Sequence, residues 1–352
     1  MKICFVLPGF TRTPIGGYKM IYEYANRLQE KGHDVAILSL NNNKMKKFHL
    51  PEFLRVALVN KINQSQPQWF PLSKKIQQIS GEEKNYLSKV NDSDIVFATG
   101  IQTVEVVKEN FSAAKKFYLI QGYENWGVSD EYVHQTYGYG FRNITVSSWL
   151  KKIVDCYSST PAYLLQNPID TTVYQAKNSQ TMRKKHSVGL LYHTDEIKGV
   201  RFALEALYKL KEKYPDLTVE MFGMFPRPKK LPKWINYKAS ASQQETVAIY
   251  NRVQVFLCAS IEEGYGLTGL EAMACGACLV STAYRGVLEY AQDGYNALLS
   301  PIKDVAALTE NIGKLFESPE ERIRLSANGV ESVKKYSWES AMEKLCHLIQ
   351  ER

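Results

Sequence analysis

The sequence lacks any hydrophobic run that approaches the length of a bilayer-spanning helix, and its first residues do not form a secretory signal pattern. The stretch Lys2–Pro8 is short and ends in Pro-Gly, where a signal would have a long apolar region and a cleavage site. Cysteine is also scarce: only six occur among 352 residues, mostly within apolar runs. Such usage is typical of small buried hydrophobes in a reducing compartment. We therefore expect a cytoplasmic protein.

Metal ligands do not occur in recognisable arrangements either. Cys275 and Cys278 have C-x-x-C spacing, but neither a second pair nor a histidine cluster accompanies them. Asp92 and Asp94 form a D-x-D pair, yet two acids are too few to specify a protein-held cation. Asp94 directly precedes the apolar run Ile95–Ala98, which indicates the start of a strand. We expect no metal and no cofactor.

Positive charge is concentrated in one segment, although the whole chain carries a formal net charge of only +8. The segment from Lys44 to Lys75 contains seven basic residues and only one acidic residue, Glu52. A solvated basic face explains such a run, and so does contact with an anionic membrane surface or a lipid diphosphate. Nucleic acid is not expected as a partner, because no binding motif accompanies the charge. The basic residues are Lys44, Lys46, Lys47, Arg55, Lys61, Lys74 and Lys75, and the interleaved apolar residues are Phe48, Phe53, Leu54, Trp69 and Phe70.

Segments typical of strands and of helices alternate along the chain, which indicates parallel sheets with crossover helices. A length of 352 residues favours two domains. The polar stretch Gln175–Lys185 separates two alternating series and is typical of a linker. We predict an α/β protein with two doubly wound, Rossmann-like domains, 1–168 and 169–336. The segment 337–352 is predicted as an amphipathic helix capped by Ser337.

The predicted strands are apolar runs of the kind found in parallel sheets. In the first domain they are Lys2–Leu7, Asp34–Leu38, Asp94–Ala98, Lys116–Ile120 and Asn143–Val146, and in the second Ser187–Leu191, Thr218–Phe222, Val255–Cys258, Cys278–Ser281 and Ala297–Leu299. The predicted helices include Gly17–Lys31, 200–213, 243–251, 270–275, 305–318 and 320–336.

One segment combines two carboxylates with a glycine-rich turn. Glu263 and Glu271 have seven residues between them and follow the strand-like run Val255–Ala259. Glycines in the turn, Gly264 and Gly266 among them, let the backbone approach a ligand closely. The helix that follows presents free N–H groups and the positive end of its dipole, which suits a phosphate.

A purely structural explanation exists for one of these glutamates. Thr268-x-x-Glu271 has the spacing of a capping box, in which the carboxylate satisfies the helix's own first amide. Glu263 does not fit this explanation, because it stands at the carboxyl end of a strand, where open α/β sheets bind ligands. Its position therefore favours a function.

The segment Ser260–Gly276 resembles the signature of family 4 retaining glycosyltransferases, which are also described as glycosyl transferases group 1. This chain has Cys278 where the family usually has Pro. The resemblance implies the GT-B fold, in which two Rossmann-like domains face a cleft. It also implies that the first domain binds the acceptor, that the second binds a nucleotide-sugar donor, and that the last helix crosses back to the first domain.

The same resemblance assigns the donor contacts. Glu271 is expected to bind the ribose hydroxyls, and Glu263 to hold the sugar together with the backbone of Gly264, Tyr265, Gly266 and Leu267.

Lys198 precedes a glycine and resembles the K-G step of the family, whose lysine neutralises the donor diphosphate. An ammonium suits a leaving group that gains charge as the glycosidic bond breaks, and the amides near Leu267 and Thr268 would assist it. An ordinary surface lysine at a helix start is the alternative. Five residues earlier the family commonly has Arg, whereas this chain has His193, so either His193 or Arg201 is expected to contact the phosphate.

In the first domain, Gly16 and Gly17 resemble the family's opening segment, where glycines allow a substrate to approach; a plain turn is the alternative. Gln121 stands where related enzymes often have His. An amide can hold a sugar hydroxyl but cannot exchange a proton at neutral pH, so Gln121 is excluded as a general base. Glu124 is a candidate substitute, and a solvated loop acid is the alternative.

The run that follows Gln121 is rich in aromatic residues. Such rings pack against sugar faces, although core packing is their more frequent use. We predict Tyr123 and Trp126 on the acceptor side; the further rings are Tyr132, Tyr137, Tyr139 and Phe141.

These features predict a retaining, metal-independent glycosyltransferase at the inner face of the cell membrane. It would move a hexose or deoxyhexose from a nucleoside diphosphate sugar, UDP or dTDP in preference to GDP, to a lipid-linked glycan acceptor in cell-surface polysaccharide or glycoconjugate synthesis. Without a base at Gln121 or an evident nucleophile, same-face transfer is the implied route. The rival hypotheses are a sugar-nucleotide epimerase of the same fold, which needs no acceptor, and a non-catalytic glycan-binding or scaffold protein.

Overall fold

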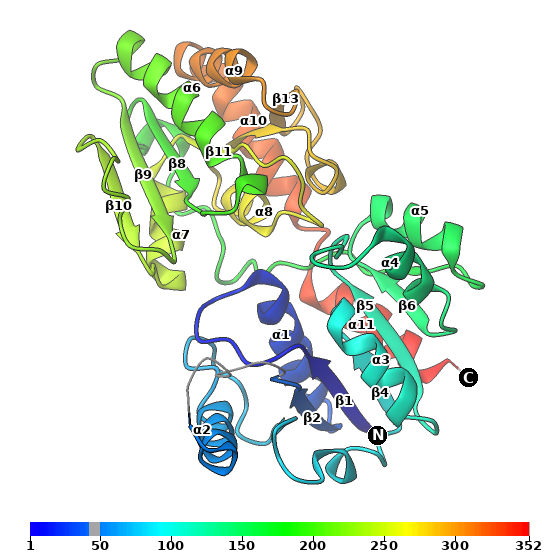
Figure 1. Ribbon diagram of the computed structural model, residues 1–352. Helices are drawn as coiled ribbons and strands as arrows, with labels where there is room; N and C mark the ends of the chain where they lie inside the picture. The colour runs from blue at the N-terminus through cyan, green and yellow to red at the C-terminus, as the bar shows by residue number, and fades with distance from the viewer. Residues whose placement is uncertain (42–49, 352) are drawn as a thin grey trace. The chain divides into compact units, whose positions relative to one another are not determined.

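The computed structural model describes residues 1–41 and 50–351, which form two units (Figure 1). Unit 1 comprises Met1–Gln166 and Met342–Arg352, and unit 2 comprises Asn167–Ala341. Each unit is an α/β structure with its own parallel sheet, as predicted.

The boundaries differ slightly from the predicted ones, which lie after residues 168 and 336. The amide of Ile169 donates to the carbonyl of Tyr336 at 2.8 Å, and Ile169 pairs with Ser337 in an isolated parallel bridge. These bonds join the segment around Ile169, at the start of unit 2, to the segment around Tyr336 and Ser337, near its end. Both segments therefore belong to unit 2, which begins at Asn167 and continues to Ala341.

Unit 1 is built on a sheet of seven strands in the order β3-β2-β1-β4-β5-β6-β7. Phe5, Phe97 and Phe117 stack across its three central strands, with ring centroids 4.7 and 5.0 Å apart. The strand order reverses between β1 and β4, the position where open sheets bind ligands at their carboxyl ends. The strands are β1 (Lys2–Leu7), β2 (Asp34–Ser39), β3 (Gln77–Ser80), β4 (Ile95–Ala98), β5 (Lys115–Ile120), β6 (Arg142–Thr145) and β7 (Tyr163–Leu164).

Unit 2 is built on a sheet of six strands in the order β10-β9-β8-β11-β12-β13, which reverses between β8 and β11. Its core is formed mainly by aliphatic residues of the strands and of the helices α6 (Val200–Lys213) and α9 (Val305–Glu317). The strands are β8 (Ser187–Leu191), β9 (Thr218–Gly223), β10 (Ile235–Ala239), β11 (Val255–Cys258), β12 (Cys278–Thr282) and β13 (Ala297–Ser300).

Helices connect most of these parallel strands or flank the sheets. In unit 1 they are α1 (Gly16–Glu30), α2 (Glu52–Gln64), η1 (Tyr86–Lys89), α3 (Ile101–Asn110), α4 (Asp130–Tyr137) and α5 (Ser148–Tyr157). In unit 2 they are η2 (Gln180–Met182), η3 (Glu196–Lys198), α6 (Val200–Lys213), α7 (Gln243–Arg252), α8 (Leu267–Ala274), η4 (Val287–Glu289), α9 (Val305–Glu317) and α10 (Pro319–Val333).

The last helix, α11 (Trp338–Gln350), begins where the sequence predicts it. Ser337 caps it, because its Oγ accepts a hydrogen bond from the amide of Ser340 at 3.2 Å. The end of the chain bonds to the first residues of two strands in unit 1: the Lys115 ammonium donates to the carbonyl of Ile349 at 3.2 Å, and the Tyr163 hydroxyl donates to the Glu351 carboxylate at 2.8 Å.

Two differences from the predicted elements bear on the account. The strands β3, β7 and β10 have no counterpart among the predicted strands, and all three lie at the edges of the sheets. Helix α8 begins at Leu267 rather than at Leu270, which changes the positions of the residues in its first turn.

Candidate functional site

The loop after β8 is held tightly against the end of β11. Gly199 has φ +60°, and a β-carbon there would lie 1.8 Å from the carbonyl oxygen of Ala259. The amide of Ile261 also donates to the carbonyl of Ile197 at 2.7 Å. Only glycine fits at position 199, and this close approach places Lys198 beside the carboxyl end of β11.

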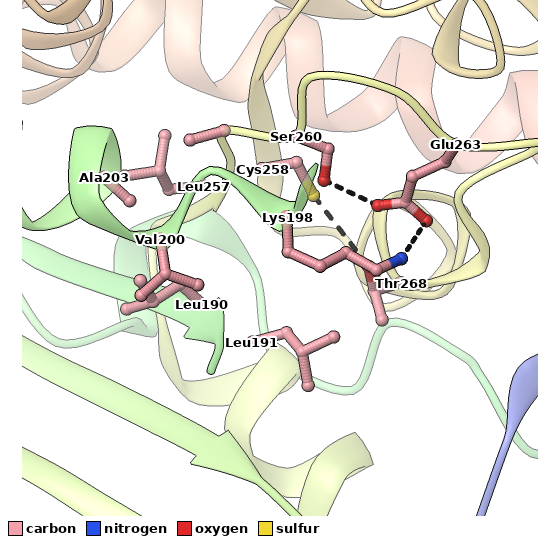
Figure 2. A pocket seen from close by; sticks show the side chains of 11 residues that line it. Leu190, Leu191, Lys198, Val200, Ala203, Leu257, Cys258, Ser260, Glu263 and Thr268 are labelled. Carbon is pink, nitrogen blue, oxygen red and sulfur yellow. Dashed lines mark hydrogen bonds and ion pairs between the residues drawn. The ribbon is translucent and has the colours of Figure 1, made fainter. Parts of the chain in front are cut away.

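Lys198 and Glu263 form an ion pair at this place (Figure 2). The lysine Nζ lies 2.9 Å from Oε2 of Glu263, and their side chains are 27% and 16% exposed. The Ser260 hydroxyl donates to Oε1 of Glu263 at 2.6 Å, and Thr282 in turn donates to the Ser260 carbonyl. Both carboxylate oxygens of Glu263 are therefore held, one by a cation and one by a hydroxyl.

The pair lies at a pocket that is lined by aliphatic side chains and by a group of polar ones, among them Lys198, Ser260 and Glu263 (Figure 2). Thr268, in the first turn of α8, also lines the pocket, and its Oγ1 lies 4.0 Å from Sγ of Cys258. The lining residues are Leu190, Leu191, Lys198, Val200, Ala203, Leu257, Cys258, Ala259, Ser260, Glu263 and Thr268.

Helix α8 starts without a side-chain cap. Gly266 is the N-cap residue, has φ +93°, and offers no side chain to the helix. The amides of Leu267 and Thr268 have no acceptor within the helix, so they and the helix dipole favour a negative charge at this end. The predicted turn, with Gly264 and Tyr265 leading into it, therefore has the geometry of an anion site.

The capping-box explanation of Glu271 is wrong, because α8 begins at Leu267. Thr268 is then the second residue of the helix and Glu271 the fifth, so neither is placed for such a cap. Instead, Oε2 of Glu271 accepts a hydrogen bond from the Tyr250 hydroxyl at 3.1 Å. The sequence offered no signal for Tyr250, which comes from α7.

His193 interacts electrostatically with the ion pair. Burial lowers the pKa of its imidazole, and the nearby ammonium of Lys198 lowers it further, while Asp195 and Glu263 act in the opposite direction. Its Nδ1 accepts a hydrogen bond from the amide of Asp195 at 3.0 Å. Arg201, by contrast, is exposed, and its guanidinium lies 4.5 Å from the ring centroid of Phe202. Of the two predicted phosphate contacts, His193 is therefore the one coupled to Lys198.

In unit 1 the structure brings two predicted residues together. A β-carbon at Gly17 would lie 3.1 Å from Nε2 of Gln121, so the amide packs directly on this glycine. Gly16 and Gly17 open α1 after β1, and Gln121 directly follows β5. Gly17 thus does more than form a turn, because it makes room for the side chain of Gln121 near the carboxyl ends of these strands.

Glu124 is not a solvated loop acid, and that alternative is wrong. Its side chain is buried, and its Oε2 accepts a hydrogen bond from the amide of Ile101, the first residue of α3, at 2.6 Å. Burial raises the pKa of this carboxyl to about 7, although the hydrogen bond acts against the shift. Glu124 therefore titrates close to neutral pH at the amino end of a helix.

The aromatic run divides into two groups. Tyr137 and Phe141 are buried and serve packing, whereas Trp126 is 65% exposed. The Tyr123 hydroxyl lies 2.9 Å from Nε2 of His134. The ring of His134 in turn stacks on exposed Tyr157 at a centroid distance of 3.8 Å. His134 and Tyr157 were missed in the sequence, because nothing in their spacing links them to Tyr123.

The structure describes part of the basic segment, while Lys44, Lys46, Lys47 and Phe48 lie outside the described residues. Its helix α2 exposes an apolar stripe formed by Phe53, Leu54 and Leu58, of which Phe53 is 71% exposed. Among residues 1–41 and 50–351, no helix is both long and apolar enough to cross a bilayer.

The acids of the D-x-D pair and the cysteines of the C-x-x-C pair can be compared with what the sequence predicts. Asp94 accepts a hydrogen bond from the amide of Lys2 at 2.7 Å and directly precedes β4, as predicted. Cys275 and Cys278 are buried, free thiols. In the described part of the chain, no three His, Cys, Asp or Glu side chains are grouped so that they could hold a metal ion.

The two parallel-sheet units define the class of fold as GT-B, that of glycosyltransferases built from two Rossmann-like domains. The crystal structure of Anabaena HepE (Alr3699) in complex with UDP and glucose is similar, with a TM-score of 0.76 over 99% of each chain. Its sequence identity to this chain is only 13%, so this likeness concerns the fold.

The sequence comparisons point to particular relatives. Residues 177–332, which include Lys198, Glu263 and Glu271, match the family Glycosyl transferases group 1. The D-inositol 3-phosphate glycosyltransferase of Corynebacterium urealyticum is 26% identical over 179 residues, which cover 46% of this chain and 42% of that protein. The MMP alpha-(1->4)-mannosyltransferase of Mycolicibacterium hassiacum is 27% identical over 210 residues, which cover 56% and 51%. The chain thus spans about half the length of these curated relatives.

Proposed function

We propose that the protein is a glycosyltransferase that moves a hexose or deoxyhexose from a nucleoside diphosphate sugar to a glycan acceptor. The observation that carries the proposal is the Lys198–Glu263 pair beside the open amino end of α8, within the part of the chain that matches the glycosyltransferase family. UDP or dTDP is proposed in preference to GDP. The UDP and glucose bound to the similar HepE structure support a donor of this kind.

Each donor contact follows from the chemistry of one side chain. Lys198, with the amides of Leu267 and Thr268, stabilises the diphosphate, which gains negative charge as it leaves. Glu263 holds sugar hydroxyls, because a carboxylate accepts hydrogen bonds from them. Glu271 accepts from the ribose hydroxyls, with Tyr250 orienting its carboxylate.

We further propose a retaining, metal-independent reaction by same-face transfer. The bond from the anomeric carbon to the diphosphate oxygen breaks, the acceptor oxygen bonds to that carbon from the same side, and its proton passes to a donor phosphate oxygen. Gln121 cannot take this proton. The protein contributes orientation and the positive charge of Lys198 and α8.

The acceptor is proposed to be a lipid-linked glycan that contacts unit 1. Gln121, packed on Gly17, offers amide groups to sugar hydroxyls, and exposed Trp126 offers a ring face. Such an acceptor fits a role in cell-surface polysaccharide or glycoconjugate synthesis at the inner face of the membrane.

Contact with an anionic membrane surface is proposed for α2. Its exposed stripe of Phe53, Leu54 and Leu58 is apolar, while Lys61 on the same helix is exposed and basic. Phe53→Asp should reduce co-sedimentation with phosphatidylglycerol vesicles, and Ile323→Asp, at an exposed apolar position of α10, should not. Equal sedimentation of wild type and Phe53→Asp would contradict the contact.

Steady-state kinetics test the proposed activity against its rivals. A transferase releases the nucleoside diphosphate only when a glycan acceptor is present, an epimerase converts the sugar nucleotide alone, and a scaffold protein binds without turnover. Glu263→Gln should mainly reduce turnover, whereas Glu271→Gln should mainly weaken donor binding. Wild-type rates and affinities in both variants would contradict the assigned roles.

A further inference from the structure

The residues that follow β12 lie directly against the backbone of the donor turn. A β-carbon at Gly286 would lie 2.5 Å from the carbonyl oxygen of Glu263 and 2.8 Å from the amide nitrogen of Tyr265. No side chain fits between the two segments at this point. Residues 284–290 therefore form the support on which the turn from Glu263 to Gly266 rests.

Two buried tyrosines of this support place their hydroxyls under Gly266. The Tyr290 hydroxyl donates to the carbonyl of Gly266 at 2.5 Å and lies 3.3 Å from the Tyr284 hydroxyl. Because the single proton of Tyr290 is directed to Gly266, Tyr284 is the donor in the bond between the two phenols. The result is a chain of hydrogen bonds that runs from Tyr284 through Tyr290 to the turn.

The hydroxyls also occupy the space that side chains in the turn would need. A β-carbon at Gly266 would lie 2.0 Å from the Tyr284 hydroxyl, and one at Gly269 would lie 2.5 Å from the Tyr290 hydroxyl. Gly266 and Gly269 therefore leave room for these two phenols, in addition to any room that the turn leaves for a ligand.

The carbonyl of Gly266 sets the direction in which α8 starts. It accepts the amide of Gly269 at 3.2 Å in addition to the Tyr290 hydroxyl. Since Gly266 has a left-handed backbone at φ +93°, a small rotation of its peptide would turn the amides of Leu267 and Thr268. A fixed carbonyl keeps these amides aimed at one place.

We infer that Tyr284 and Tyr290 are positioning residues of the donor site, whose paired hydroxyls fix the Gly266 peptide and thereby aim the first amides of α8 at the donor diphosphate. This inference rests on the proposed function, because it takes the diphosphate as the group at the amino end of α8. Neither tyrosine touches the donor in this account; they act through the backbone.

The test compares diphosphate and monophosphate binding in Tyr→Phe variants. Tyr290→Phe should weaken UDP binding about tenfold in calorimetry, in line with the loss of one hydrogen bond to a buried carbonyl. Tyr284→Phe should weaken UDP binding by a smaller factor, because its hydroxyl acts through Tyr290. Both variants should weaken UMP binding less than UDP binding. If the wild type binds dTDP or GDP instead of UDP, the same comparison is made between dTDP and dTMP or between GDP and GMP.

Tyr214→Phe is the matched control, because its hydroxyl donates to the Glu317 carboxylate at 2.7 Å in another part of unit 2. This variant should melt at a lower temperature without changing the ratio of diphosphate to monophosphate affinity. If the wild type binds the diphosphate more tightly than the monophosphate and Tyr290→Phe has the same ratio of the two affinities, the inference is wrong but the proposed function stands. Failure of the wild type to bind any of these nucleotides would overturn the proposed function and the inference with it.

Discussion

The ammonium of Lys198 lies 2.9 Å from the carboxylate of Glu263, so the cation proposed for the donor diphosphate is already paired with the acid proposed for the sugar. A donor has to compete with Glu263 for this lysine, or share it. The pair therefore keeps Lys198 in place before the donor binds, at a cost to the affinity for the diphosphate.

The first prediction concerns this competition. Glu263→Gln should raise the affinity for a nucleoside diphosphate without a sugar by a few-fold, about the strength of a partly exposed ion pair, while turnover with the complete donor falls. Lys198→Met should lower the same affinity about tenfold or more, since it removes a charge-assisted contact. Isothermal titration measures both. Weaker diphosphate binding in Glu263→Gln would show that Glu263 does not compete with the diphosphate for Lys198.

The second prediction separates the ribose contact from the phosphate contact. Glu271→Gln should weaken the binding of the nucleoside diphosphate about tenfold but leave the binding of inorganic pyrophosphate unchanged, because Glu271 is assigned to the ribose. Glu262→Gln is the control, because its carboxylate lies in the loop before α8 and accepts a hydrogen bond from Nε of Arg285 at 3.0 Å; it should change neither affinity. An equal loss for both ligands in Glu271→Gln would refute the ribose assignment.

The third prediction is a pH dependence of donor binding through His193. Burial and the Lys198 ammonium lower its pKa, so the imidazole is neutral at pH 7, whereas a bound diphosphate would raise the pKa. Binding should therefore take up protons, and the affinity should rise as the pH falls below 7. Titrations in buffers with different ionisation enthalpies detect this uptake. His193→Gln should abolish it, and the same uptake in that variant would assign the proton to another group.

The fourth prediction concerns stability and Glu124. Its carboxyl has a pKa of about 7 in the folded protein, above the ordinary value of 4.5, so the folded state holds the proton more tightly than the unfolded state does. The stability of unit 1 should accordingly decrease as the pH rises from about 4.5 to about 7, by up to about 3 kcal/mol. Glu124→Gln keeps an acceptor for the Ile101 amide without a charge, and should raise the melting temperature at pH 8 more than at pH 5. A difference that does not change with pH would contradict this.

The sequence predicts the centres of both sheets better than their edges. β1, β4, β8 and β11 are apolar runs with two buried faces, which cannot be mistaken for surface segments. β10 has polar residues and only Ile235 buried, and β7 consists of two residues, so neither gives a periodic signal. The edge strand β13 is predicted because it is apolar and mostly buried, whereas edge strands such as β7 and β10 are recognisable only from the neighbours with which they pair.

In the candidate site, too, the sequence predicts features that lie close together along the chain, but not contacts between residues that are far apart in it. The spacing of Glu263 and Glu271 lies within one turn and helix, so the sequence predicts it directly. The residues that hold this region in place come from other parts of the chain and carry no signal of their own: Tyr250 donates to the Glu271 carboxylate, Thr282 to the Ser260 carbonyl and Tyr290 to the Gly266 carbonyl. The burial of Glu124 likewise depends on α3, which the residues around Glu124 do not reveal.

The central claim, that unit 2 holds a nucleoside diphosphate sugar through Lys198 and the start of α8, is tested most directly by a thermal-shift titration. The wild type should melt at a higher temperature with at least one of UDP, dTDP, GDP or their sugars, since a ligand that binds only the folded protein stabilises it. Lys198→Met should lose that shift. The absence of a shift in the wild type with every one of these ligands would contradict the account.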